Sequence, residues 1–79
     1  MEKKEIYVKL NEIFRDVLDN DEIELQDSTT ADDIEEWDSL GHIQLVVAIE
    51  KAFGLKFQSS EIISWKNVGE MVDAIESKL

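Results

Sequence analysis

Apolar residues recur at helical spacing in three separate segments of this 79-residue chain, and the chain contains no proline. The segments cover about Lys3–Leu18, Ser39–Phe53 and the residues after Asn67. In the first segment the apolar residues at this spacing are Ile6, Leu10, Ile13, Phe14, Val17 and Leu18. Repeats at intervals of three and four residues place an apolar stripe along one side of a helix. A chain this short buries only about 60% of its unfolded surface, so the stripes must share one small core. We therefore predict an all-α bundle that forms a single domain over residues 1–79.

Local signals predict where the helices begin and end. Gly54 is a natural stop for the second helix, and Asn67 with Glu70 three residues later has the spacing of a capping box. A brief helix is predicted over residues 59–63, capped by one of the two serines at its start. One face of the last helix should contain Val68, Met71, Val72, Ile75 and Leu79. The expected fold has three main helices, one short helix and a long loop between the first two helices.

The second helix carries apolar residues on two sides. The predicted core stripe consists of Leu45, Val46, Ile49 and Phe53, with Ile43 at its edge. Leu40 and Val47 fall nearly opposite this stripe, beside Gln44 and Lys51. Singly exposed apolar residues are ordinary, so these two alone need no functional explanation. Their closeness to a serine at the helix start nevertheless indicates a contact surface.

The long loop over residues 20–38 mixes acidic residues with serines, threonines and isolated apolar residues. A structureless loop of this length is unusual unless it is anchored or functional. A short turn is plausible around residues 31–35. The apolar residues expected to pin the loop to the core are Ile23, Leu25, Ile34 and Trp37.

The charge is strongly unbalanced. The net charge is −11, and eleven acidic residues lie between Asp16 and Asp38 without one Lys or Arg. Such a surface repels nucleic acid and anionic lipid, so neither is expected as a partner. Two interpretations of the acids stay open: a solvated face that keeps a small protein soluble, and an electrostatic target for basic partner proteins.

Several kinds of site are excluded by the residues present. The chain has no cysteine, and therefore no disulfide framework and no thiolate metal site. Asp19 begins a stretch like a calcium loop, but the sixth position lacks glycine and Ile23 replaces an oxygen ligand. No segment approaches the roughly 20 apolar residues of a membrane span. A soluble, cytoplasmic protein without a bound metal is the expectation.

Ser39 is the leading candidate for a functional residue. Asp38 is predicted to cap the second helix, which leaves Ser39 at the first helical position with its hydroxyl toward water. Nucleophilic catalysis would need a base, and the one histidine, His42, falls on the core side and is expected to pack against the loop. The chain is therefore not expected to be an enzyme. Acidic residues directly before the helix, Glu35 and Glu36, add charge beside the serine.

With these features together, the sequence resembles the acyl carrier proteins, the phosphopantetheine-binding carriers that include aminoacyl and peptidyl relatives. The resemblance covers nearly the whole chain, from the first helix through Asp38-Ser39-Leu40 to the helix after Val68. It implies that a phosphopantetheinyl transferase attaches 4'-phosphopantetheine from coenzyme A to Ser39, with magnesium assisting. The terminal thiol of that arm would then carry acyl or aminoacyl groups as thioesters.

The resemblance also implies partners. Enzymes that load and process the cargo commonly read this surface with basic patches. The contact residues carried over by position are Asp38, Leu40, Val47 and Glu50, with Glu35 and Glu36 before them. The carrier would act as a monomer, and its capped helices suggest that it stands alone.

Some positions differ from the fatty-acid type of carrier. Gly41 and Gln44 stand where acids are common, Lys51 follows an acid, and Trp37 replaces a small residue. These changes favour a dedicated biosynthetic pathway over general fatty acid synthesis. Trp65 is either an ordinary packing residue or one that narrows a cargo pocket. A different class of function also stays open: an unmodified acidic helical module that binds a basic partner.

Overall fold

The computed structural model describes residues 2–79. It contains the helices α1 (Lys3–Val17), α2 (Ser39–Phe53), α3 (Ser59–Ile62) and α4 (Val68–Lys78), together with one turn of 3₁₀ helix, η1 (Ala31–Asp33). No strand occurs in this part of the chain. The predicted all-α fold of three main helices and one short helix is confirmed, and η1 lies where a short turn was expected in the loop.

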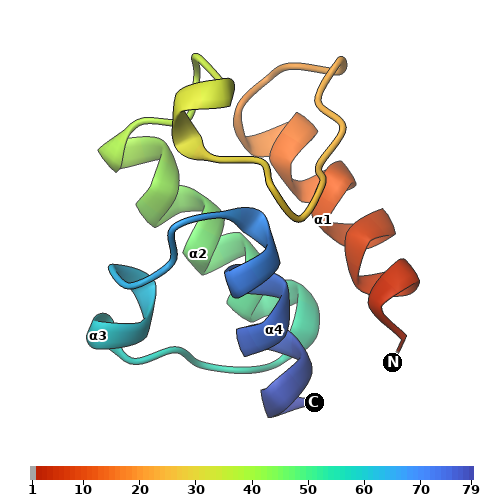
Figure 1. The fold of residues 1–79 in the computed structure, drawn as a ribbon, viewed down its shortest axis with the longest axis vertical. Helices are drawn as coiled ribbons and strands as arrows, with labels where there is room; N and C mark the ends of the chain where they lie inside the picture. Colours follow the sequence, from red (N-terminus) through yellow and green to blue (C-terminus); the bar gives the residue numbers. More distant parts are fainter. Residues whose placement is uncertain (1) are drawn as a thin grey trace.

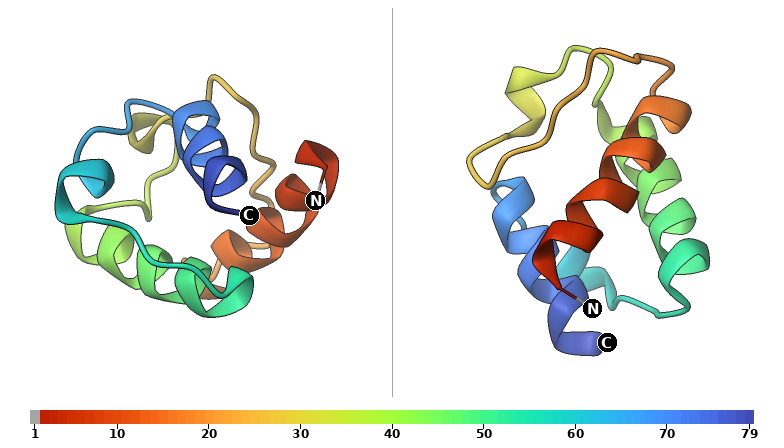
Figure 2. Two further views of the ribbon diagram at one scale, coloured as in Figure 1. Left: turned by 90° about the horizontal axis from the view of Figure 1, so that it is seen from below. Right: turned by 90° about the vertical axis from the view of Figure 1, so that its right-hand side faces the viewer.

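The three main helices enclose one core. α1 packs against both α2 and α4. Seen from below, α4 lies over α2, with α1 on one side and the short α3 on the other (Figure 2, left). The loop between α1 and α2 covers the end of the molecule opposite the end of α4 (Figure 1). α2 therefore begins directly beneath this loop.

The predicted apolar stripes meet in that core. Phe14 is completely buried, and its ring meets the edge of Trp37 from the loop at a centroid distance of 5.0 Å. The other completely buried side chains come from α1, α2 and α4 and include Ile6, Leu10, Leu45, Ile49, Val68, Met71 and Ile75. Helical spacing thus identified the core residues of all three main helices.

Two apolar residues were placed wrongly by the helical pattern. Ile43 was expected at the edge of the core stripe, but 60% of its surface is exposed. Each residue turns a helix by about 100°, which puts Ile43 beyond Val46 and outside the buried stripe. Leu79 was expected on the buried face of the last helix, but it is the cap after the last helical residue and is 50% exposed.

Helix termini agree with the sequence at α2 and differ at α3. Gly54 adopts the left-handed conformation with φ of 67° and ends α2, as predicted. α3 begins after Gln58, whose backbone N–H donates to the Glu61 carboxylate at 2.9 Å. Neither serine is the cap, because Ser59 is already the first helical residue. The prediction of a serine cap was wrong since it overlooked the residue before the pair.

The start of α4 is closed by the loop. The Asn67 side chain accepts from the Glu70 N–H at 2.9 Å, as the predicted capping box requires. The Glu70 carboxylate, however, accepts from the Lys66 N–H at 3.3 Å, so only half of the box forms. The two backbone N–H groups between Asn67 and Glu70 donate to the loop. The Val68 N–H donates to the Thr29 carbonyl at 2.8 Å, and the Gly69 N–H donates to the Asp27 carbonyl at 3.0 Å.

The loop is anchored along its length, as its isolated apolar residues predicted. Ile23, Leu25 and Trp37 are buried, and Ile34 packs against the core. Polar contacts to α1 add to this: the Leu25 N–H donates to the Asn11 side chain at 2.8 Å, and the Arg15 guanidinium donates to the Ile23 carbonyl at 2.7 Å. The loop therefore holds a defined path across the end of the bundle. In the described part of the chain, no helix has the length and apolar character needed to span a membrane.

Candidate functional site

The start of α2 presents Ser39 to solvent. Asp38 has extended backbone angles and its carboxylate accepts from the Gly41 N–H at 2.7 Å, which confirms it as the helix cap. Ser39 is the first helical residue and is exposed. Its hydroxyl has no hydrogen-bond partner within residues 2–79. The side chain is therefore free to be approached by another molecule.

Two backbone donors beside Ser39 are also free. The N–H groups of Ser39 and Leu40 find no acceptor in the described part of the chain, whereas the next N–H is taken by Asp38. Unpaired N–H groups at a helix start, together with the helix dipole, favour a bound anion. The terminus thus combines a free hydroxyl with two free donors.

Gly41 lies close to the loop in the first turn of α2. It is buried, and a side chain there would approach the Glu36 carbonyl and the Leu18 side chain at 3.1 Å each. A side chain at this position would therefore require its neighbours to shift by a few tenths of an ångström. The loop thus packs closely on the first turn of α2.

Exposed apolar side chains follow Ser39 along α2. Leu40 and Val47, predicted to face solvent, are 66% and 44% exposed. Ile43 lies with them, which the sequence did not predict. Ile63, at the end of α3, is the most exposed large apolar residue among residues 2–79 at 85%, and it lines the same pocket as Ile43 and Ser39. Its isolated position after a four-residue helix gave no signal in the sequence.

The predicted acidic contact residues differ in their surroundings. Glu35, Glu36 and Asp38 are exposed directly before Ser39. The Glu36 carboxylate accepts from the Asn20 side chain at 3.2 Å. Glu50 is half-buried, and its carboxylate accepts from the Phe57 N–H at 2.9 Å, which fastens the linker between α2 and α3. Glu50 therefore has a structural role that spacing along α2 did not reveal.

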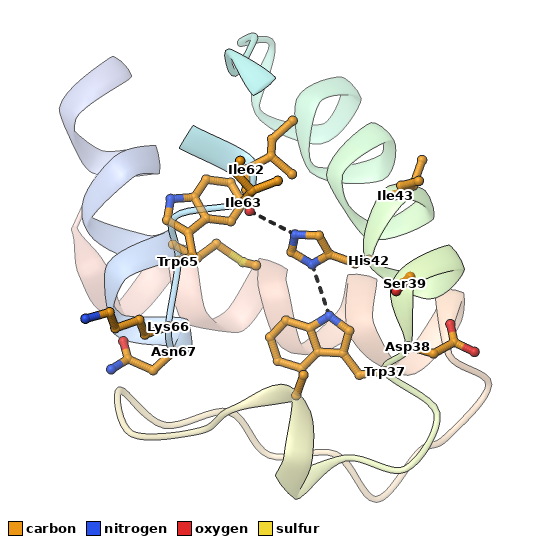
Figure 3. Close-up of a pocket in the computed structure, with 12 residues that line it drawn as sticks. Trp37, Asp38, Ser39, His42, Ile43, Ile62, Ile63, Trp65, Lys66 and Asn67 are labelled. Atoms are coloured by element: carbon orange, nitrogen blue, oxygen red, sulfur yellow. Dashed lines mark hydrogen bonds between the residues drawn. The ribbon is translucent and has the colours of Figure 1, made fainter. Parts of the chain in front are cut away.

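A pocket of about 580 Å³ opens beside Ser39. Its lining comes from the loop, α2, α3 and the start of α4, and Figure 3 shows His42 between the labelled residues of these elements. The His42 ring accepts from the Trp37 indole N–H at 3.1 Å and lies 3.2 Å from the Ile62 carbonyl. His42 packs against the loop, as predicted, and the structure adds its link to α3.

These contacts leave His42 poorly suited to act as a base for Ser39. One ring nitrogen accepts from Trp37, and the other then carries the hydrogen that is donated to the Ile62 carbonyl. Both nitrogens are thus engaged away from the serine hydroxyl. Within residues 2–79 there is no cluster of side chains arranged to bind a metal ion.

The sequence around this site matches a known protein family. Residues 8–75 match the family described as a phosphopantetheine attachment site. The fold and the free serine at a helix start thus belong to a class of domains that carry a phosphopantetheine arm.

Individual relatives narrow the class. The acyl carrier protein of Coprothermobacter proteolyticus is 32% identical over 100% of this chain and 96% of its own length. That of Petrotoga mobilis is 36% identical over 100% of this chain and 93% of its own. The solution structure of the holo acyl carrier protein of Geobacter metallireducens matches with a TM-score of 0.85 and 42% identity, covering 91% of this chain and 83% of that one. The chain therefore belongs to the acyl carrier protein family.

Membership explains what the site does in general terms. The protein is a carrier and not an enzyme, and its prosthetic group is 4'-phosphopantetheine. The group supplies a thiol that holds an acyl chain as a thioester, which also fits a chain without cysteine. The family interacts with phosphopantetheinyl transferases and with acyl-processing enzymes. The free hydroxyl, the two free N–H groups and the adjoining pocket suit such a group.

Proposed function

We propose that Ser39 is the residue to which 4'-phosphopantetheine is attached. The observation that carries this proposal is the start of α2, where an exposed serine hydroxyl stands beside two backbone N–H groups without protein acceptors. In the transfer from coenzyme A, the Ser39 oxygen attacks the phosphorus on the pantetheine side of the pyrophosphate and loses its proton. The P–O bond to the nucleotide breaks, so that a phosphodiester forms on Ser39 and adenosine 3',5'-bisphosphate leaves. The phosphate then stays next to donors that favour an anion.

We further propose that partner enzymes dock on the surface around Ser39. Basic patches would meet the exposed acids Glu35, Glu36 and Asp38. Apolar side chains of a partner would cover Leu40 and Val47, which are 66% and 44% exposed. Glu50 is included at the far end of this surface, where its carboxylate also holds the linker to α3. The partners are the phosphopantetheinyl transferase and the enzymes that load and process acyl or aminoacyl groups.

The pathway proposed for this carrier is a dedicated biosynthetic one. The first two turns of α2 after the serine contain Gly41 and Gln44 in place of acids, and Lys51 adds a positive charge further along. A partner adapted to a denser row of acids would gain less from this surface. We also propose that residues 1–79 act as one carrier domain and as a monomer.

The experiment that tests attachment compares two serines that occupy equivalent positions. Ser39 and Ser59 are each the first residue of a helix and each is exposed. Wild type, Ser39→Ala and Ser59→Ala are incubated with a broad-specificity phosphopantetheinyl transferase, coenzyme A and magnesium, and their intact masses are measured. Wild type and Ser59→Ala should each gain one phosphopantetheine, and Ser39→Ala none.

Two controls make the result decisive. Circular dichroism of each variant shows whether the helices remain, and an established carrier in the same tube shows that the transferase works. Modification of Ser39→Ala would contradict the proposal. No modification of folded wild type would favour an unmodified interaction module instead.

A further inference from the structure

His42 crosses the pocket beside Ser39 and is fixed at both ring nitrogens. Its partners are the Trp37 indole N–H, from the loop, and the Ile62 carbonyl, at the end of α3. In Figure 3, Ser39 and Ile43 lie on one side of His42, and Trp65 and Asn67 lie on the other. His42 thus connects α2 to the loop and to α3 across the pocket beside Ser39.

Aromatic rings support His42 from both sides. The Trp37 ring lies nearly parallel to it, at a centroid distance of 6.0 Å and an interplanar angle of 22°, with the hydrogen bond joining the two ring edges, and the Trp65 ring meets it at a steep angle with a centroid distance of 6.1 Å. The contacts continue from Trp37 to Phe14 at 5.0 Å and from Trp65 to Phe57 at 4.9 Å. Five rings therefore form one connected row, and His42 is its middle member.

Displacing His42 would carry a clear penalty. Trp37 is buried, so moving the histidine leaves an indole N–H without its acceptor in an apolar surrounding. The Ile62 carbonyl would lose its donor at the same time. The lining of the same pocket also includes Met71, which is completely buried and apolar. Because His42 lies between Ser39 and Trp65, an acyl chain that enters from the Ser39 side and extends toward Trp65 must pass His42 (Figure 3).

We propose that His42, backed by Trp37 and Trp65, determines cargo length: it confines a sheltered acyl chain to the outer part of the pocket, next to Ser39 and Ile43. The carrier then shelters short acyl chains and leaves long ones exposed to water. This inference rests on attachment at Ser39. Trp65 contributes to the length limit because its ring contacts His42.

The test compares thioester hydrolysis for two chain lengths. Wild type and His42→Ala are loaded with butyryl or decanoyl phosphopantetheine from the matching acyl-coenzyme A. Each hydrolysis rate is divided by that of the free acyl-coenzyme A, because exclusion of water slows hydrolysis. In wild type, the butyryl thioester should be protected several-fold and the decanoyl thioester not at all. In His42→Ala, the decanoyl thioester should become protected several-fold.

Matched variants separate a length limit from a general loss of stability. Gln44→Ala changes an exposed residue of α2 outside the pocket and should behave like wild type. Trp37→Phe keeps an aromatic ring but removes the indole donor, and should protect the decanoyl thioester partly. It replaces His42→Ala if thermal melting shows that the latter does not fold. Equal or better protection of the decanoyl chain in wild type would overturn the proposal.

A second readout requires no loading, so failure of attachment at Ser39 is distinguishable from failure of the length limit. An unchanged intact mass after the loading reaction would count against attachment alone. ¹⁵N-labelled protein is then titrated with decanoyl-N-acetylcysteamine thioester, and the indole N–H signals of Trp37 and Trp65 are followed. Both signals should shift in His42→Ala and stay in place in wild type. Equal shifts in the two proteins would overturn the length limit.

Discussion

The starts of α2 and α4 have the same kind of side-chain cap, but their other backbone N–H groups have opposite surroundings. At α2 the Asp38 side chain binds one N–H, and the two N–H groups before it have no acceptor within residues 2–79. At α4 the Asn67 side chain binds one N–H, and the two before it donate to loop carbonyls. The same loop closes one helix start and leaves the other open.

The two helix starts differ in what their backbone donors are used for. At α4 the backbone donors are used for folding, since they fasten the loop to the bundle. At α2 they remain available, and the exposed residue among them is a serine. The open donors at α2 are therefore the feature that separates the proposed attachment site from the equally capped start of α4.

The largest effect is expected from opening the closed terminus at α4. A side chain at Gly69 would approach the Asp27 carbonyl at 3.0 Å and disturb the hydrogen bond between these residues. Gly69→Val should therefore lower the free energy of unfolding by about 2–3 kcal/mol, as overpacking commonly does. For a domain of this size, the melting temperature would fall by roughly 8–20 °C.

The control for Gly69→Val is Glu76→Val, which adds the same side chain to an exposed position of α4. This variant should melt close to wild type. A melting temperature of Gly69→Val that matches the control would show that the loop does not close α4 as described.

A smaller effect is expected at the two caps. Asn67→Ala and Asp38→Ala each remove one side-chain acceptor and should each cost about 1 kcal/mol of unfolding free energy. Only the change at Asp38 should also slow modification by the transferase. Denaturant unfolding and the rate of mass gain, measured on the same samples, check both statements.

Asp38→Asn separates the cap from the charge. Asparagine caps a helix about as well as aspartate, so stability should change by only a few tenths of a kcal/mol. The proposed basic partner would nevertheless lose one acid beside Ser39, and modification should slow several-fold. An unchanged rate would remove Asp38 from the docking surface.

Another small effect concerns the alkaline side of the stability curve. The Tyr7 hydroxyl donates to the carboxylate of Asp27, the residue whose carbonyl accepts from Gly69. Burial, and after it this hydrogen bond, raises the pKa of Tyr7 well above its ordinary value of 10.0. A raised pKa means that the folded state favours the protonated phenol. The stability contributed by the protonated Tyr7 phenol is complete below pH 10.0, and it is lost as the pH rises through the raised pKa of the folded state.

The measurement is thermal melting from neutral to alkaline pH for wild type and Tyr7→Phe. At neutral pH the variant should be less stable by about 0.5–1 kcal/mol, as is typical for one hydrogen bond. The difference should shrink above pH 10.0. A constant difference across the range would contradict the assignment of this contact.

Much of the fold followed from local features of the sequence. Helical spacing identified Leu10, Leu45 and Ile75 as core residues, and isolated apolar residues such as Ile23 and Trp37 identified the anchors of the loop. Short-range capping signals located the starts of α2 and α4. These features are local because they depend on residues a few positions apart.

The remainder depends on contacts between distant residues. The hydrogen bond between Val68 and Thr29 and the link between His42 and Ile62 join segments whose approach no local pattern encodes. The steric role of Gly41 and the structural role of Glu50 have the same origin. At the candidate site, Ser39 and its cap were predictable, whereas the pocket beside them was not.

Attachment at Ser39 can be observed directly by locating the prosthetic group on the wild-type protein. After reaction with the transferase and coenzyme A, the chain is digested and its peptides are fragmented in a mass spectrometer. We expect phosphopantetheine on Ser39 and an unmodified Ser59. Phosphopantetheine on any residue other than Ser39 would contradict this expectation.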